Sequence, residues 1–88
     1  MSKKVVFVDD SQTVLMSSKM IVKPLVDSGV IEFFEFENPL DFLEKVKKEG
    51  FIYDLVITDV NMPQMNGLDM AKELKSIPEL RLKPILAL

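Results

Sequence analysis

Three aspartates follow two apolar segments of this chain, and their placement suggests a shared chemistry. Residues 5–8 run directly into Asp9 and Asp10. Residues 55–58 run directly into Asp59. Ligands of open parallel sheets collect outside the carboxyl ends of the strands. If the two segments are neighbouring strands, the three carboxylates meet at one edge. Because like charges repel at short range, a hard divalent cation with oxygen ligands is the expected neutraliser.

Asp59 could also act as a nucleophile. A carboxylate at a strand end that faces a bound Mg²⁺ can attack phosphorus and form an acyl phosphate. Mg²⁺ takes six oxygens and keeps several waters, so two or three protein ligands are sufficient. Asp9 and Asp10 could bind the metal directly or through water, and the loop after Asp59 could add a backbone carbonyl. This pattern therefore predicts a phosphoryl-accepting magnesium site.

The composition excludes several other kinds of site. The 88 residues, 48% hydrophobic and 28% charged, fit one small globular domain. The chain has no histidine and no cysteine, which excludes a phospho-accepting histidine, a His-ligated zinc site and a disulfide. With a net charge of −3 and scattered lysines, we expect no nucleic-acid binding. No apolar run suits a membrane span or a signal peptide, so we expect a cytoplasmic protein.

Alternating strands and helices must position the aspartates. The apolar patterns predict strands at residues 4–9, 31–37, 54–58 and 84–88. They predict helices after Ser11, after Asn38 and from Gly67, with Pro24 kinking the first helix or ending it early. This alternation argues for a parallel α/β sheet. In the strand order 2-1-3-4, the two aspartate-tipped strands are neighbours at the switch point.

Two smaller sets of residues carry further expectations. Leu40, Leu43 and Val46 recur at helical spacing and should line one face of the second helix. Met62 and Met65 fit two readings equally well, either adaptable packing in a loop or part of a partner surface.

Two segments together resemble a known family. They are Val-Asp-Asp-Ser at residues 8–11 and Leu-Val-Ile-Thr-Asp-Val-Asn-Met-Pro-Gln-Met-Asn-Gly at residues 55–67. The chain resembles the response-regulator receiver domain of two-component signalling, and the match spans the whole chain in order. The resemblance implies a flavodoxin-like parallel sheet in the order 2-1-3-4. It also implies that Pro63 and Gly67 shape the loop after the third strand, where glycine allows close backbone approach.

The resemblance also implies a role for each site residue. Asp59 would be the phosphoacceptor, and Asp9 and Asp10 would be the acidic pair that binds Mg²⁺. The backbone carbonyl of Asn61 would be the third protein ligand, so that Asp9, Asp10, Asp59 and Asn61 together surround the metal. The phosphoryl donor would be a phosphohistidine of a sensor histidine kinase or phosphotransfer protein, or a small acyl phosphate.

The end of the chain departs from the family pattern. Receivers continue with a hydroxyl residue after the fourth strand, a fifth strand that delivers a lysine, an aromatic switch residue and two more helices. We therefore expect residues 1–88 to form a partial receiver domain that lacks the fifth strand and last two helices. Lys83 precedes the fourth strand, at the wrong end to replace that lysine. The fourth strand should be an unpaired edge beside an exposed apolar face.

Three functions remain open at this point. The first is a phosphoacceptor signalling domain, which is not an enzyme beyond phosphorylating and dephosphorylating itself. The second is a non-switching, receiver-derived module that forms a homodimer through the strand-four edge. The third is a hydrolase with an aspartyl-phosphate intermediate, which needs a second acid two residues after its nucleophile. From Asp9 that position is Ser11, so the spacing does not fit.

Overall fold

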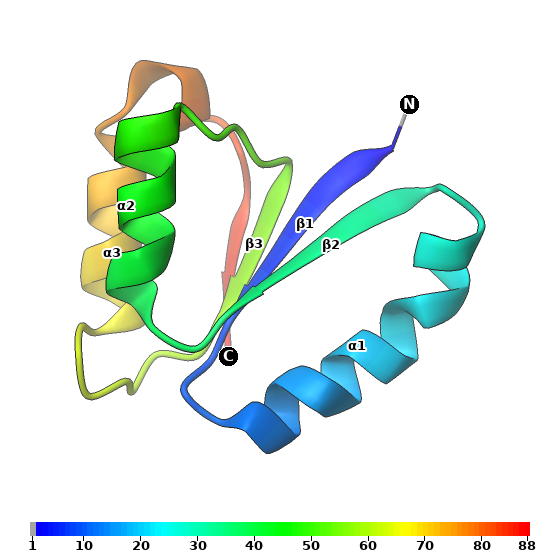
Figure 1. The fold of residues 1–88 in the computed structure, drawn as a ribbon. Helices are drawn as coiled ribbons and strands as arrows, with labels where there is room; N and C mark the ends of the chain where they lie inside the picture. The colour runs from blue at the N-terminus through cyan, green and yellow to red at the C-terminus, as the bar shows by residue number, and fades with distance from the viewer. Residues whose placement is uncertain (1) are drawn as a thin grey trace.

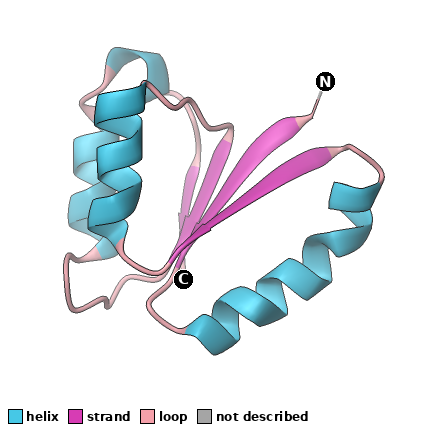
Figure 2. Ribbon diagram, in the orientation of Figure 1, coloured by secondary structure: helices cyan, strands magenta, loops and turns pink. Residues whose placement is uncertain are grey.

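Within residues 2–88, which the computed structural model describes, four parallel strands form one sheet between two layers of helices (Figures 1 and 2). The elements in chain order are β1 (Lys3–Val8), α1 (Gln12–Asp27), β2 (Ile31–Phe36), α2 (Pro39–Glu49), β3 (Leu55–Thr58), α3 (Gly67–Lys75), the 3₁₀ helix η1 (Pro78–Leu80) and β4 (Ile85–Ala87). The strand order is β2-β1-β3-β4. Helix α1 covers one face of the sheet, and α2 and α3 cover the other (Figure 1). The expected flavodoxin-like order 2-1-3-4 is confirmed.

The register of β1 and β3 brings the two aspartate-bearing ends to the same level. Val8 of β1 lies opposite Thr58 of β3. The residues that follow, Asp9 and Asp59, therefore leave the sheet side by side. The Asp59 N–H donates to the Val8 carbonyl at 3.0 Å, which continues the ladder past the end of both strands.

The hydrophobic core lies between the sheet and the α2/α3 layer. Its buried residues are Val6, Val8, Phe42, Leu43, Val46, Tyr53, Val56, Met62, Met70, Leu74 and Leu80. Phe42 is at its centre, with ring centroids 5.1 Å from Phe36 and 5.9 Å from Tyr53. Such close aromatic packing on one sheet face makes this layer the rigid support of β3 and of the loop that follows it.

Helix α2 begins and ends as its sequence predicts, but its buried face differs. The Asn38 side chain accepts the Leu40 N–H at 2.9 Å, and Gly50 ends the helix with φ of 67°. Leu40, expected to share a face with the buried Leu43 and Val46, is 47% exposed, whereas Phe42 is fully buried. Each residue turns an α-helix by about 100°. The apolar stripe is centred on Phe42, Leu43 and Val46, so Leu40 points away from it.

Helix α1 contradicts one expectation about Pro24. The helix continues through Pro24 to Asp27, so of the two expected outcomes, a kink or an early end, the early end is wrong. The proline stands in the last turn and removes only one backbone donor, and its own carbonyl still accepts the Ser28 N–H at 3.1 Å. One missing hydrogen bond near a helix end therefore does not stop the helix.

Helix α1 also leaves much apolar surface open. Leu15 is its one buried residue within the described chain. Six other apolar residues of the helix are exposed, namely Val14, Met16, Met20, Ile21, Leu25 and Val26. Leu86 of β4 is 55% exposed, and β4 pairs only with β3 among the described strands. Within the described residues, β4 is an open edge as expected, and the exposed apolar surface lies mainly on α1 rather than on the sheet. No helix of the described residues is long and apolar enough to cross a membrane.

Candidate metal centre

Three carboxylates converge at the carboxyl end of the sheet. Asp9, Asp10 and Asp59 each offer one oxygen, and these oxygens all lie within 4.8 Å of one another. Asp9 is buried, Asp59 is half-buried and Asp10 is exposed. The two chain segments expected to meet therefore do meet, and their charges face one small volume. Oxygen donors at this spacing suit a hard cation such as Mg²⁺.

Asp9 is the most confined member of the cluster, with 6% of its surface exposed. Its Oδ1 accepts the Ser11 N–H at 2.9 Å, which fixes the side chain at the start of α1. Burial raises the pKa of Asp9 above its ordinary value of 3.8, and the nearby charges of Asp59 and Asp10 raise it further, whereas the Ser11 N–H lowers it. The cluster is thus electrostatically strained without a counter-charge.

Ser11 is a helix cap, as its position predicts. Its side-chain oxygen accepts the Val14 N–H at 3.3 Å at the start of α1. The residue therefore links the acidic pair to the helix on that face of the sheet. A capping oxygen that accepts a backbone hydrogen bond is structural, in agreement with the absence of a histidine that could activate it.

The loop after Asp59 is drawn closely against that residue. The Gly67 N–H donates to the Val60 carbonyl at 2.8 Å. A Cβ on Gly67 would lie 2.2 Å from the Asp59 carbonyl oxygen, a distance that no side chain can occupy. The expected close backbone approach at glycine is therefore present. Asn66 caps α3 by accepting the Leu68 N–H at 2.7 Å, which anchors the far end of the loop.

Asn61 and the two loop methionines take different positions. Asn61 is exposed, two residues beyond Asp59. Met62, the next residue, is 7% exposed and belongs to the core. The partly buried Met65 packs against the core. Packing rather than a partner surface therefore accounts for Met62. The loop is held inward at Met62, while Asn61 stays exposed at the surface.

Thr58 has a contact that its sequence context did not reveal. We expected only a strand residue, but its fully buried hydroxyl donates to the Asp59 carbonyl at 2.8 Å. The sequence gives only a weak indication of this contact. The alternation of β3 places the side chain of residue 58 on the buried face, and that residue carries a hydroxyl directly before Asp59. That signal indicates a hydrogen bond, but it does not name the acceptor.

Lys83 lies at the opposite end of the sheet, as expected. Its Nζ is 3.3 Å from Asp54, which precedes β3. Asp54 also accepts the Lys4 N–H at 2.7 Å. That backbone hydrogen bond lowers the pKa of Asp54 below its ordinary 3.8; burial opposes this shift, and the hydrogen bond and charge of Lys83 add to it. Lys83 is thus part of a structural ion pair, not of the acidic site.

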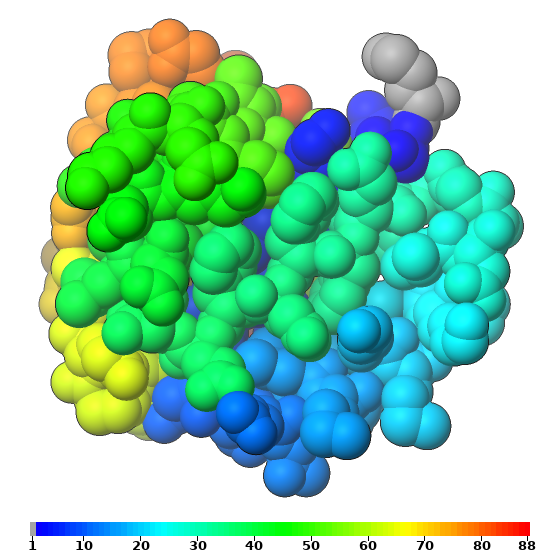
Figure 3. All heavy atoms as spheres, viewed as in Figure 1, coloured from blue at the N-terminus to red at the C-terminus, as the bar shows by residue number. Residues whose placement is uncertain are grey.

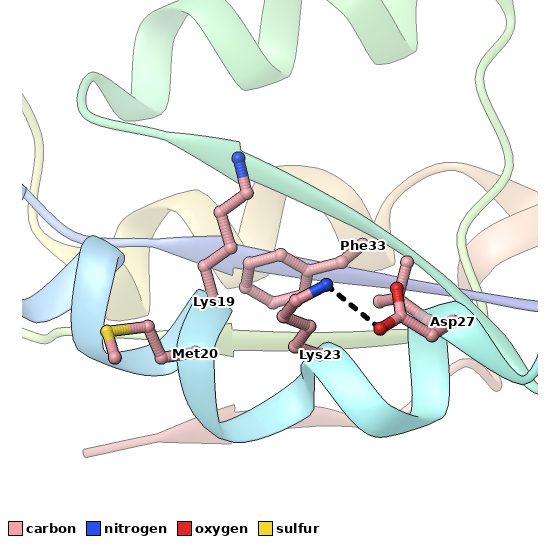
Figure 4. Close-up of a pocket in the computed structure, with 6 residues that line it drawn as sticks. Lys19, Met20, Lys23, Asp27 and Phe33 are labelled. Atoms are coloured by element: carbon pink, nitrogen blue, oxygen red, sulfur yellow. Dashed lines mark hydrogen bonds and ion pairs between the residues drawn. The ribbon is translucent and has the colours of Figure 1, made fainter.

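An apolar hollow lies elsewhere on the described part of the chain. It has a volume of about 320 Å³ and lies between α1 and β2 (Figures 3 and 4). Its lining residues are Lys19, Met20, Lys23, Val26, Asp27 and Phe33. Lys23 is engaged by Asp27 at 2.9 Å, the ion pair drawn in Figure 4. None of the three clustered aspartates lines this hollow, so it is separate from the acidic site.

Comparison with known proteins agrees with this geometry. The family model of the response regulator receiver domain matches residues 5–88, nearly the whole chain. The chain belongs to the receiver domain family. Chemotaxis protein CheY-3 of Vibrio cholerae serotype O1 is 38% identical over 84 residues, covering 94% of this chain and 60% of that protein. The chemotaxis protein CheY of Bacillus subtilis is 36% identical over 77 residues, covering 88% of this receiver chain and 60% of that protein.

Solved structures show the same fold. The chemotaxis response regulator CheY4 of Vibrio cholerae superposes with a TM-score of 0.78 at 30% identity, covering 99% of this receiver chain and 68% of that chain. The receiver chain spans about 60% of the length of the curated relatives named above. The family and the fold are therefore established by both sequence and structure.

Proposed function

We propose that this receiver chain accepts a phosphoryl group on Asp59 in a Mg²⁺-dependent way during two-component signal transduction. The observation that carries the proposal is the meeting of three carboxylates from two distant segments, with oxygens within 4.8 Å of one another. A structural role alone would not place repelling charges together, one of them buried. Binding of a divalent cation beside a phosphoryl group would explain why these three carboxylates lie together.

The donor set fits Mg²⁺. The proposed ligands are carboxylate oxygens of Asp9, Asp10 and Asp59 and the backbone carbonyl of Asn61, all of them hard oxygen donors. Asp10 and Asn61 are exposed, which leaves room for the waters that Mg²⁺ retains. When bound, the ion would neutralise charge that develops on the phosphoryl and carboxylate oxygens. Residues 1–88 would thus form a partial receiver domain with its proposed metal ligands present.

The chemistry of this chain would then be a single in-line displacement. A carboxylate oxygen of Asp59 attacks phosphorus and forms an acyl phosphate bond. With a phosphohistidine donor, the P–N bond breaks and the imidazole keeps the electron pair and takes a proton. With acetyl phosphate, the P–O bond breaks and acetate leaves. Half-buried Asp59 presents its oxygen at the sheet edge, where a donor can approach.

Partners follow from this chemistry. The chain has no histidine, so the phosphohistidine must come from another segment or protein, such as a sensor histidine kinase or a phosphotransfer protein. We propose no activity beyond accepting and losing the phosphoryl group. A cytoplasmic location would suit such a donor, and the net charge of −3 disfavours nucleic acid as a partner of this domain.

Labelling with acetyl phosphate tests the proposal. Intact-mass spectrometry in the presence of Mg²⁺ should detect one added phosphoryl group on wild type, and the signal should disappear with a chelator. Asp59→Asn is the matched control, since it keeps size and removes the nucleophile. Absence of label on wild type that binds Mg²⁺ would contradict the phosphoacceptor role. Equal labelling of Asp59→Asn would contradict the assignment to Asp59.

The open β4 edge favours a second function. Leu86 of β4 and Leu88 beyond it are 55% and 66% exposed, and β4 has no further strand beside it in the described chain. Such an edge can pair with that of a second copy. The alternative is therefore a non-switching module that forms a homodimer there. Sedimentation velocity across a concentration series separates the two, since a monomer at all concentrations contradicts the alternative.

A further inference from the structure

Thr58 directly precedes the proposed phosphoacceptor and contacts its backbone. The Thr58 side chain has no exposed surface, and its Oγ1 donates to the Asp59 carbonyl oxygen at 2.8 Å. Buried hydroxyls need a partner, and this one is the peptide group that links residues 59 and 60. Since a peptide group is planar, fixing its oxygen fixes the orientation of the whole unit.

Other contacts hold the same stretch from different sides. The Asp59 N–H donates to the Val8 carbonyl at 3.0 Å, and the Gly67 N–H donates to the Val60 carbonyl at 2.8 Å. Within residues 2–88, the hydroxyl of Thr58 provides the one side-chain hydrogen bond to the backbone of Asp59. The backbone amide and both following carbonyls are therefore each held by a separate group.

From these contacts we infer that Thr58 is a positioning residue for the metal site, an inference that rests on the proposed function. The peptide group that Thr58 fixes is the first of two between Asp59 and Asn61. Buried Met62 holds the chain on the far side of Asn61. With the chain held on both sides, the path of the backbone through Asn61 is restricted. Loss of the hydroxyl frees the Asp59 carbonyl to change orientation. The Asp59 carboxylate and the Asn61 carbonyl should then be positioned less often to bind the same metal ion.

A purely structural role for the hydroxyl is the competing explanation, and three variants separate it. Thr58→Val keeps the branched shape and removes the hydroxyl. Thr58→Ser keeps the hydroxyl and removes a methyl group. Thr58→Ala removes both. If Thr58 positions the site, metal affinity should depend on the hydroxyl. If Thr58 only packs, metal affinity should depend on the methyl group.

Calorimetric titration with Mn²⁺ is the test, with metal-free thermal unfolding measured beside it. Groups that orient metal ligands typically change affinity by 10-fold or more when they are removed. Thr58→Val should therefore bind Mn²⁺ about 10-fold more weakly than wild type, and Thr58→Ser should stay within about twofold. If Thr58→Val does not fold, the Ser and Ala variants, which differ only in the hydroxyl, should show the same roughly 10-fold difference.

The outcomes distinguish the inference from the function on which it rests. Equal affinities of wild type and Thr58→Val, or of the Ser and Ala variants, would overturn the positioning role and leave the metal site intact. Affinity that follows the methyl group would assign Thr58 to packing and would also overturn the inference. No saturable binding to folded wild type would overturn the proposed metal site itself, and the inference with it.

Discussion

The α-carbon of Gly67 lies against the carbonyl of Asp59, so close that a Cβ at position 67 would come within 2.2 Å of that oxygen. This contact joins the start of α3 to the residue proposed to receive the phosphoryl group. The neighbouring atoms are backbone atoms of Asp59 and Val60, which cannot rotate away as a side chain could. A substitution at Gly67 must therefore displace the loop or the helix.

Gly67→Ala should lower the free energy of unfolding by about 2–3 kcal/mol, because overpacking against backbone strains both segments. It should also weaken Mg²⁺ binding, since the loop that carries Asn61 moves. Urea unfolding and metal titration measure the two effects. Gly29→Ala is the control: space there is open but φ is +80°, so it should cost about 1 kcal/mol and leave metal affinity unchanged. Normal metal affinity in Gly67→Ala would contradict the coupling between glycine and site.

Asp9→Asn should stabilise the metal-free protein while abolishing its response to Mg²⁺. Burial and two neighbouring carboxylates raise the pKa of Asp9, so its charge at neutral pH opposes folding. Asparagine keeps the acceptor for the Ser11 N–H and removes the repulsion. Thermal unfolding with and without Mg²⁺ measures both effects. A variant that Mg²⁺ stabilises as strongly as wild type would remove Asp9 from the ligand set.

Tyr53 offers a prediction about alkaline pH. Its hydroxyl is buried without a hydrogen-bond partner among residues 2–88, and burial raises its pKa from 10.0 to about 12. The folded state holds the proton more tightly, so stability should fall as the pH rises from 10 towards 12. Tyr53→Phe should remove this decline and add about 1 kcal/mol at neutral pH.

Tyr53 is the single tyrosine of a chain without tryptophan, so tyrosinate absorbance reports its ionisation alone. That titration can be recorded beside alkaline unfolding on the same sample. An ordinary midpoint near 10 in the folded protein would show that the hydroxyl is solvated or hydrogen-bonded. Phe36→Leu, which alters the aromatic contact with Phe42 and removes no titrating group, should keep the alkaline decline.

Asp54 should stabilise the fold at neutral pH and lose this contribution in acid. The Lys4 N–H and Lys83 lower its pKa below 3.8, so its contribution is complete above that value and is lost as the pH falls further. Asp54→Ala should cost about 1–2 kcal/mol at neutral pH, and the difference should shrink in acid. The exposed ion pair of Asp27 with Lys23 is the control, because Asp27→Ala should cost only about 0.5 kcal/mol. Guanidinium unfolding over a pH series measures both.

Much of the fold and of the acidic cluster follows from the sequence. Apolar runs that end in aspartate, and the alternation of strands with helices, predict a parallel sheet with aspartates at two strand ends. The resemblance to receivers adds the strand order that makes β1 and β3 neighbours. The errors have physical causes. Leu40 points outward because a turn of about 100° per residue moves it off the stripe centred on Phe42. Helix α1 continues past Pro24 because a proline in the last turn removes only one hydrogen bond.

Other features lie beyond sequence patterns. The path of the loop in space brings Met62 into the core. It also decides that the Thr58 hydroxyl donates to the Asp59 carbonyl. Periodicity gives the face on which a strand residue lies, but it does not give the acceptor of a buried hydroxyl. The role proposed for the Asn61 carbonyl comes from the resemblance to receivers, because a backbone carbonyl carries no signal in the residue type.

Titration with Mg²⁺, followed by amide chemical shifts in NMR spectra, tests the central claim most directly. Asp9, Asp10 and Asp59 are proposed to surround one ion, so the shifts should saturate with one affinity and concentrate at residues 9–11 and 58–61. Asp54, at the other end of the sheet, should not respond. Shifts that fail to saturate, or that spread over the surface acidic residues alike, would contradict a metal site formed by these three aspartates.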